Sequence, residues 1–181
     1  MHITSFITVR TTSTRLPEKC LLPFGDSNVL EHIIHRSRFY GLEPIVCTST
    51  DQSDDKIEEI AVSQGVKIFR GSLINKLKRW LDCCNKFNIN AFHSIDADDP
   101  FFDGDLVKKS MQYLENGYDV ICPTESSSNG AASVGYSIKA EIIEKAVDLT
   151  KDDTDTEMMW YYLDKIPGIK KTILPEKKEN Q

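Results

Sequence analysis

The sequence has no run of about 18 apolar residues, and its first residues lack a cationic segment followed by a long apolar stretch. We therefore expect neither a membrane-spanning helix nor a secretory signal peptide. It also lacks an excess of basic residues, because 28 Asp and Glu against 22 Lys and Arg give a formal net charge of -6. That balance argues against a general nucleic-acid or membrane-surface binder, since both depend on basic patches. We expect a cytoplasmic protein.

Other patterns that would indicate a function are also missing. The five cysteines show no zinc-ligand spacing, and their odd number within apolar stretches suits buried, reduced thiols. No G-x-x-x-x-G-K-[ST] pattern is present, which excludes a Walker loop, and there is no internal repeat. Any functional site of this protein must therefore be built from less common motifs.

Short apolar runs alternate with amphipathic segments along the first 124 residues. This alternation is typical of an α/β fold with an open, mostly parallel sheet sandwiched by helices, and 181 residues suit one domain. The predicted strands are 3–9, 44–50, 66–70, 90–96 and 118–124, and the predicted helices are 28–41, 53–65, 74–87 and 103–117.

The alternation weakens after residue 124. A polar, serine-rich loop precedes a predicted strand and helix within 134–150, a capped helix within 152–168 and a last strand at 169–174. We expect residues 125–174 to be the less regular part of the domain. The charged residues 175–181 predict a frayed tail.

The segment that follows the first strand, residues 10–19, concentrates donors for an anion. Backbone N–H groups, cations and hydroxyls together could hold several phosphate oxygens, more than a single phosphate needs. A solvated basic loop that pairs with the acidic surface is the alternative. The cations are Arg10, Arg15 and Lys19, and the hydroxyls are those of Thr12, Ser13 and Thr14.

A second polar segment, residues 96–103, follows the strand at 90–96. Asp96 and Asp98 offer the carboxylates that Mg²⁺ prefers, whereas Asp103 is placed to cap the next helix. Carboxyl ends of parallel strands lie at one edge of a sheet, so both polar segments should face one crevice. Alone, the acidic segment is an ordinary turn; beside a cationic loop, it indicates a metal and polyphosphate site.

Together these segments resemble signatures of the sugar-activating cytidylyltransferases, the group of the 3-deoxy-manno-octulosonate and acylneuraminate cytidylyltransferases, and most closely its spore-coat polysaccharide biosynthesis (SpsF-like) branch. The branch pattern A-R-M-G-S-T-R-L-P-G-K-x-L is matched by Arg10, Ser13, Thr14, Arg15, Leu16, Pro17, Lys19 and Leu21. The second signature, F-R-G-S with a later leucine and an R-Y pair, is similar to Phe69, Arg70, Gly71, Ser72, Leu77, Arg79 and Trp80. The metal signature G-D-x-P-L-x-D is matched by Asp98, Pro100 and Asp103.

The resemblance implies a nucleotidyltransferase domain of the glycosyltransferase-A (GT-A) type across residues 1–181. Its implied reaction is Mg²⁺-dependent and joins CTP to a sugar or sugar acid, giving a CMP-sugar and pyrophosphate for surface polysaccharide biosynthesis. It further implies a homodimer, with residues 125–174 contacting the sugar or the second subunit. The implied catalytic residues are Arg15, Lys19 and Asp98, and the implied metal ligands are Asp98 and Asp96. The implied nucleotide ligands are Arg10, Thr12, Ser13, Thr14, Arg15, Lys19, Arg70, Ser72, Asn75 and Arg79.

This chain departs from the family pattern at several positions. Thr12 and Glu18 replace glycines, Ala97 replaces the glycine before the metal aspartate, and the family's later metal aspartate is missing, so that Asp96 or Glu157 would have to substitute. A catalytically weakened family member is therefore an alternative. Another is a glycosyltransferase-like domain that binds a nucleotide sugar, because Asp96, Ala97 and Asp98 also fit the D-x-D metal motif. A non-enzymatic assembly subunit is a third.

Four further residues allow two interpretations each. Asn75 stands where the branch has an acidic residue, and it either reads the nucleotide base, loosening the choice between CTP and UTP, or caps the helix that follows. For His93 a buried strand histidine bonded to the backbone is favoured over a catalytic base. Trp80 and Trp160 are expected in the core rather than as stacking platforms for a base.

Overall fold

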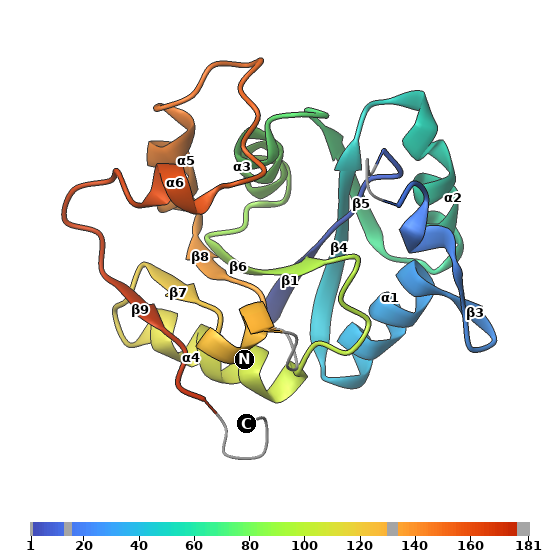
Figure 1. Ribbon diagram of the computed structural model, residues 1–181, viewed down its shortest axis with the longest axis horizontal. Coiled ribbons are helices and arrows are strands. Elements are labelled where there is room, and N and C mark those ends of the chain that lie inside the picture. Colours follow the sequence, from blue (N-terminus) through green and yellow to red (C-terminus); the bar gives the residue numbers. More distant parts are fainter. Residues whose placement is uncertain (1, 13–15, 130–133, 177–181) are drawn as a thin grey trace.

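The computed structural model describes residues 2–12, 16–129 and 134–176. These residues form a seven-stranded sheet with helices on both faces and a separate two-stranded hairpin (Figure 1). The strands are β1 (Ile3–Thr8), β2 (Pro23–Phe24), β3 (Ser27–Asn28), β4 (Leu42–Ser49), β5 (Lys67–Gly71), β6 (Ala91–Asp96), β7 (Val120–Cys122), β8 (Ser137–Lys139) and β9 (Lys171–Ile173). The α-helices are α1 (Val29–Phe39), α2 (Asp55–Ser63), α3 (Lys76–Phe87), α4 (Gly104–Glu115), α5 (Ala140–Val147) and α6 (Trp160–Leu163). The 3₁₀ helices are η1 (Lys19–Leu21), η2 (Gln52–Asp54) and η3 (Glu125–Asn129).

The sheet has the strand order β5-β4-β1-β6-β8-β7-β9. Strands β5, β4, β1 and β6 pair in parallel, which confirms the predicted open α/β fold. Strand β8 runs antiparallel to both of its neighbours, β6 and β7. The chain enters β8 very close to β6, since a Cβ built on Gly135 would lie 1.7 Å from the carbonyl oxygen of Ser94. Position 135 therefore needs glycine.

Two apolar cores lie on the two faces of the sheet. Successive strand side chains point to opposite faces, so Ile7 of β1 packs into one core and Phe6 into the other. Helices α1, α2 and α4 supply the first core, and α3, α5 and α6 supply the second. The helices thereby cover both faces and leave the strand ends as the places where polar loops gather.

Two tryptophans behave differently. Trp80 is fully buried in the core, as predicted, and its indole N–H donates to the Thr8 hydroxyl at 2.9 Å. The prediction for Trp160 was wrong, because α6 has only four residues and leaves this side chain 49% exposed. A short helix buries one side, and here Leu163 rather than Trp160 faces the core.

His93 is a buried strand residue, as predicted, but its partner is not the backbone. Its Nδ1 lies 2.8 Å from the Ser137 hydroxyl, which also accepts a hydrogen bond from Ser110 at 2.7 Å. Among the atoms described, Nε2 has no hydrogen-bond partner. Burial lowers the pKa of His93 to about 3, since the charged imidazolium would lose its hydration.

The cysteines are mostly buried, and the carboxyl-terminal segment contacts the rest of the domain. All five cysteines are free, and four of them are buried, as predicted. Burial raises the pKa of Cys20 to about 11, so this thiol is unreactive at neutral pH. In the segment predicted to fray, the Glu176 carboxylate accepts hydrogen bonds from Ser126, and residues 177–181 lie outside the described part.

Candidate active site

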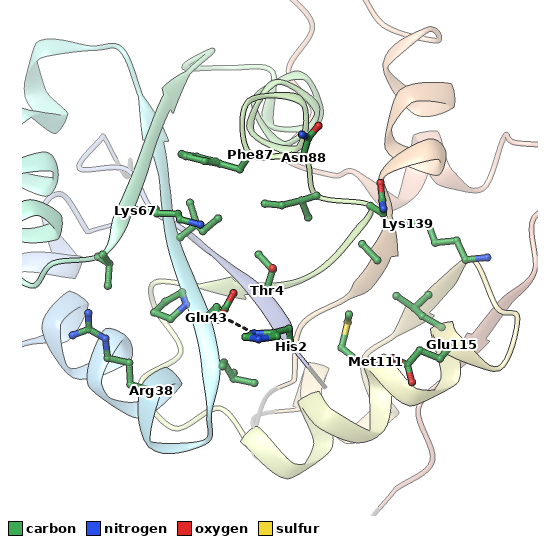
Figure 2. Close-up of a pocket in the computed structure, with 18 of the residues that line it drawn as sticks. His2, Thr4, Arg38, Glu43, Lys67, Phe87, Asn88, Met111, Glu115 and Lys139 are labelled. Carbon is green, nitrogen blue, oxygen red and sulfur yellow. Dashed lines mark ion pairs between the residues drawn. The ribbon is translucent and has the colours of Figure 1, made fainter.

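Two large depressions open at opposite ends of the parallel strands. One lies at the edge formed by their amino ends, and the other lies at the edge formed by their carboxyl ends. The amino-edge pocket, about 700 Å³, lies where β1, β4 and β6 begin (Figure 2). Two of its ionisable side chains have carboxylate partners: His2 Nδ1 lies 2.6 Å from Glu43 Oε1, and Lys139 Nζ lies 2.8 Å from Asp119 Oδ1. Arg38 donates to two backbone carbonyl groups. Ligands of open parallel sheets bind at the other edge, outside the carboxyl ends of the strands.

The carboxyl-edge pocket, about 490 Å³, lies where β1 and β6 end. These strands are parallel neighbours, and the Ala97 N–H donates to the Thr8 carbonyl at 3.1 Å. The loops that follow β1 and β6 therefore face one crevice, which confirms the prediction. The pocket is lined by Thr8, Val9, Arg10, Thr12, Lys19, Cys20, Arg79, Asp96, Ala97, Asp98, Asp155 and Glu157.

The loop of residues 10–19, called the phosphate loop below after its predicted role, is closed at its base by the described residues on either side of 13–15. The Glu18 N–H donates to the Thr11 carbonyl at 3.0 Å, and Lys19 opens η1, whose Cys20 is buried in the core. This closure brings Arg10 and Lys19 to the same pocket. Ser13, Thr14 and Arg15, all predicted nucleotide ligands, lie outside the described residues.

Asp54 anchors the phosphate loop, and the sequence analysis missed it. Its fully buried carboxylate accepts hydrogen bonds from the N–H and hydroxyl of Thr11, both at 2.8 Å, and from Thr48 and Ser49 at the end of β4. Burial alone would raise the pKa of Asp54, but the hydrogen bonds from Ser49, Thr11 and Thr48 outweigh it and hold the pKa below its usual value. The only sequence signal was the polar run after the second predicted strand.

Opposite charges pair in and beside the carboxyl-edge pocket. Lys19 of the phosphate loop forms an ion pair with Asp98, which follows β6. Arg10 Nη2 lies 2.9 Å from Glu157 Oε2, and Lys76 Nζ lies 3.4 Å from Asp96 Oδ1. The cations and carboxylates come from segments far apart in the sequence, so only the fold assembles them. Asp103 is not part of this set, because it caps α4 as predicted.

Glu157 and Asp155 bring a third acidic segment to the pocket. In the sequence these residues were read mainly as helix caps, with Glu157 also considered as a substitute metal ligand. The Glu157 side chain is 57% exposed and meets Arg10, which also donates to the Leu73 carbonyl at 2.7 Å. Arg10 thus connects the phosphate loop to two other segments.

The residues of the second signature separate into two groups. Arg79 lines the pocket, is 1% exposed, and donates to the Ser72 carbonyl at 2.7 Å, while its Nε has no partner among the described atoms. Arg70 instead binds Glu58 and the backbone carbonyls of residues 49 and 51. Ser72 receives a hydrogen bond from the Asn75 N–H. Arg70 and Ser72 are not among the lining residues of the pocket.

Asn75 caps α3, which confirms one of its two interpretations. Its side-chain oxygen accepts from the Lys78 N–H at 2.9 Å, and its amide donates to the Thr150 hydroxyl and the Lys151 carbonyl. The residue is fully buried. Because these contacts occupy both ends of its amide, the side chain has no group left to offer to a base.

The carboxylates of the pocket suit a metal ion that is coordinated partly by the protein and partly by a bound ligand. Within residues 2–12, 16–129 and 134–176, no cluster of three or more His, Cys, Asp or Glu side chains could hold a metal ion by itself. Mg²⁺ does not need such a cluster, because it binds through one or two carboxylates together with waters and substrate phosphates. Asp96, Asp98, Asp155 and Glu157 provide oxygens of this type around the pocket.

A comparison with known protein families identifies the chain. The model of the cytidylyltransferase family matches residues 5–175. The protein belongs to the cytidylyltransferase family. This cytidylyltransferase-family chain is 30% identical over 182 residues to an uncharacterized protein of Methanocaldococcus jannaschii, covering 99% of this chain and 74% of that protein.

Two further relatives carry descriptive names. The chain is 32% identical over 120 residues to the spore coat polysaccharide biosynthesis protein SpsF of Bacillus subtilis, covering 62% of this chain and 50% of that protein. It is 28% identical over 146 residues to a 3-deoxy-manno-octulosonate cytidylyltransferase of Rickettsia akari, covering 72% of this chain and 58% of that protein. The alignments thus span about half of each of these two relatives.

Solved cytidylyltransferase structures share the fold. One from Leptospira borgpetersenii superposes with a TM-score of 0.81 at 23% identity, covering 100% of this chain and 79% of that chain. A CMP:2-keto-3-deoxy-manno-octonic acid synthetase complexed with CTP gives 0.72 at 15% identity, covering 96% of this chain and 90% of that chain. In the part of the family member described here, no helix is long and apolar enough to span a membrane.

Glu18, where the family pattern has glycine, holds the left-handed conformation that glycine favours. Its φ is 55°, whereas Thr12, the other replaced glycine, is not among the residues with positive φ. A left-handed non-glycine residue costs about 1–2 kcal/mol, and glycine's greater freedom in the unfolded chain offsets part of this. We expect Glu18→Gly to raise the free energy of unfolding by about 0.5–1 kcal/mol, measured by urea denaturation.

Glu18→Ala is the matched control for that substitution. It removes the same carboxylate but keeps a Cβ at the left-handed position, so it should not stabilise the protein. Equal stabilisation by both variants would mean that charge repulsion, rather than backbone strain, is relieved at position 18.

Proposed function

We propose that the protein transfers the cytidylyl group of CTP to a hydroxyl of a sugar or sugar acid, producing a CMP-sugar and pyrophosphate. The observation that carries the proposal is the carboxyl-edge pocket of a cytidylyltransferase-family chain, in which Lys19 meets Asp98 and Arg10 meets Glu157. The name of its SpsF relative supports a product used in polysaccharide biosynthesis. The identity of the sugar is outside this proposal.

In the proposed reaction, the acceptor oxygen forms a bond to the α-phosphorus of CTP. The bond from that phosphorus to the oxygen bridging to the β-phosphate breaks, pyrophosphate leaves with the electron pair, and the hydroxyl proton is released. Negative charge therefore builds on the departing pyrophosphate. Arg10 and Lys19 supply preformed positive charge there, and Arg15 has the same predicted role.

Nucleotide binding would exchange the partners of these charged groups. In the structure, Asp98 pairs with Lys19 and Glu157 pairs with Arg10, contacts that phosphate oxygens could make instead. Phosphates that take over the two cations would release both carboxylates. A released carboxylate beside a polyphosphate is repelled unless a cation joins it.

Mg²⁺ fits that requirement, with Asp98 as its proposed protein ligand and a second carboxylate of the pocket as a further candidate. When bound, the ion would neutralise phosphate charge and orient the triphosphate. The orientation of the cations themselves comes from the chain, through the closure of the phosphate loop and its anchor at Asp54.

The direct test is pyrophosphate release from CTP and Mg²⁺ with a panel of sugars and sugar acids. Release with at least one acceptor is expected. A thermal-shift series with CTP, UTP, UDP-sugars and Mg²⁺ should show stabilisation by CTP. Stabilisation by UDP-sugars alone would instead support the D-x-D alternative at Asp96, Ala97 and Asp98, and no stabilisation by any nucleotide would contradict the proposal.

Lys19→Met should weaken CTP binding by roughly 1.5–3 kcal/mol, because it removes a charge-assisted contact to phosphate. This corresponds to about 10-fold to 100-fold in Kd, measured by calorimetry with Mg²⁺ present. Lys108→Met is the control, since Lys108 pairs with Asp105 on the surface of α4. If both variants bind CTP like the unmodified protein, Lys19 does not contact phosphate.

We further propose that the protein forms a homodimer. Met158, Trp160 and Tyr161 are 64%, 49% and 50% exposed, a larger apolar surface than α6 alone needs. The other segment expected at this interface, residues 131–138, lies partly outside the described residues. Light scattering at high micromolar concentration should give twice the chain mass of 20.6 kDa, and a monomer at that concentration would contradict the proposal.

A further inference from the structure

The two candidate metal carboxylates, Asp96 and Asp98, have similar exposure but different partners. Their side chains are 57% and 47% exposed, and both line the carboxyl-edge pocket. Asp98 pairs with Lys19, which is 27% exposed and belongs to the phosphate loop. Asp96 pairs with Lys76, whose side chain is only 8% exposed.

The two lysines differ in whether a bound phosphate can replace the carboxylate with which each one pairs. Lys19 lines the pocket, so a phosphate can bind its ammonium and release Asp98. Lys76 is not a lining residue; it pairs with Asp96, and its ammonium lies 5.0 Å from the centroid of the Trp80 ring. Trp80 is itself fixed, because it is fully buried and donates to the Thr8 hydroxyl. Asp96 is therefore expected to keep its cation when the nucleotide binds.

Lys76 also stands in a place that is unfavourable for a cation. It is the first residue of α3, where the helix dipole repels positive charge, and the first turn of α3 contains no acidic residue. Its burial removes hydration from the ammonium. Asp96 is the carboxylate with which it pairs, and Lys76 Nζ lies 3.4 Å from Asp96 Oδ1. A lysine that is 8% exposed and pairs with a carboxylate of the pocket wall is a candidate for a role at that pocket.

We propose that Lys76 is a positioning residue that acts as a built-in counter-ion of Asp96, so that Asp98 rather than Asp96 binds the metal. This inference rests on the proposed function. The fixed ammonium neutralises Asp96 and lowers its attraction for a second cation. Asp96 then remains a neutralised hydrogen-bond acceptor at the pocket wall.

The test uses Mn²⁺ as a spectroscopic probe, with the number and affinity of bound ions measured by electron paramagnetic resonance in the presence of CTP. We expect the same number of Mn²⁺ ions per chain, with the same affinity, in the unmodified protein and in Asp96→Asn. Asp98→Asn should weaken Mn²⁺ binding by at least about tenfold, since even an outer-shell change around a metal has that effect. Equal losses in Asp96→Asn and Asp98→Asn would overturn the inference.

The double variant Asp98→Asn with Lys76→Met separates a counter-ion from a merely structural lysine. Removing the ammonium frees Asp96, so the double variant should recover part of the Mn²⁺ affinity lost in Asp98→Asn. Adding Lys76→Arg to Asp98→Asn keeps a cation at position 76, so this double variant should recover none of the lost Mn²⁺ affinity. If Lys76→Met restores no binding while the melting temperature shows a folded protein, Lys76 does not control Asp96.

This outcome is distinguishable from failure of the proposed function. If the unmodified protein binds CTP with Mn²⁺ but the Asp96 and Asp98 variants behave alike, only the assignment of Lys76 is wrong. If the unmodified protein binds no nucleotide with any metal, the proposed function fails, and the inference fails with it.

Discussion

Asp54→Asn is expected to lower the free energy of unfolding by about 3–5 kcal/mol, one of the largest effects of any single substitution in this protein. The Asp54 carboxylate accepts from two backbone N–H groups, those of Thr11 and Ser49, one on each oxygen. A hydroxyl can rotate to become an acceptor, but a backbone N–H cannot. An asparagine amide would therefore place NH₂ against one of these N–H groups in a fully buried site.

The same substitution should weaken CTP binding, because Asp54 holds Thr11 beside Arg10 in the phosphate loop. Urea denaturation measures the loss of stability, and calorimetry at a temperature where the variant is folded measures CTP affinity. Asp51→Asn is the control in the same turn. Asp51 accepts from the Ser53 N–H at an exposed position, where asparagine serves equally well as a cap. Normal stability of Asp54→Asn would show that the buried carboxylate does not anchor the loop.

Acidification from pH 7 to pH 5 should cost about 2 kcal/mol of stability through His93 alone. The pKa of His93 is depressed from 6.5 to about 3 in the folded protein. Below pH 6.5 the unfolded chain binds a proton at this residue and the folded protein does not, so stability falls as the pH falls. The loss continues until the pH reaches the folded pKa, because both states are then protonated.

The slope of unfolding free energy against pH, measured by urea denaturation between pH 7 and pH 5, tests this expectation. His93→Gln should flatten the slope even if it lowers stability at every pH, because the group that titrates has been removed. An unchanged slope in His93→Gln would mean that other groups cause the acid sensitivity.

The sequence alone determined the class of fold and the edge of the sheet that carries the site. Strands and helices can be predicted from apolar residues that recur every two and every 3.6 residues. A parallel strand places the loop that follows it at the carboxyl edge of the sheet. The positions of Arg10, Lys19 and Asp98 followed from that rule, and the pocket confirms that they share one crevice. Capping by Asp103 was predicted, and capping was one of two interpretations of Asn75, because a cap involves neighbours three residues apart.

The tertiary structure alone decided which polar groups are buried and what they contact. Asp54 meets Thr11 across 43 positions, and Arg10 meets Glu157 across 147 positions, separations at which a local pattern holds no information. The same reason explains the exposed Trp160 and the hydroxyl partner of His93, since burial depends on the layer that covers an element. Lys76 is the sharpest case: its place in the sequence is that of an ordinary helical lysine, and only the packing of α3 against β6 makes it the fixed partner of Asp96.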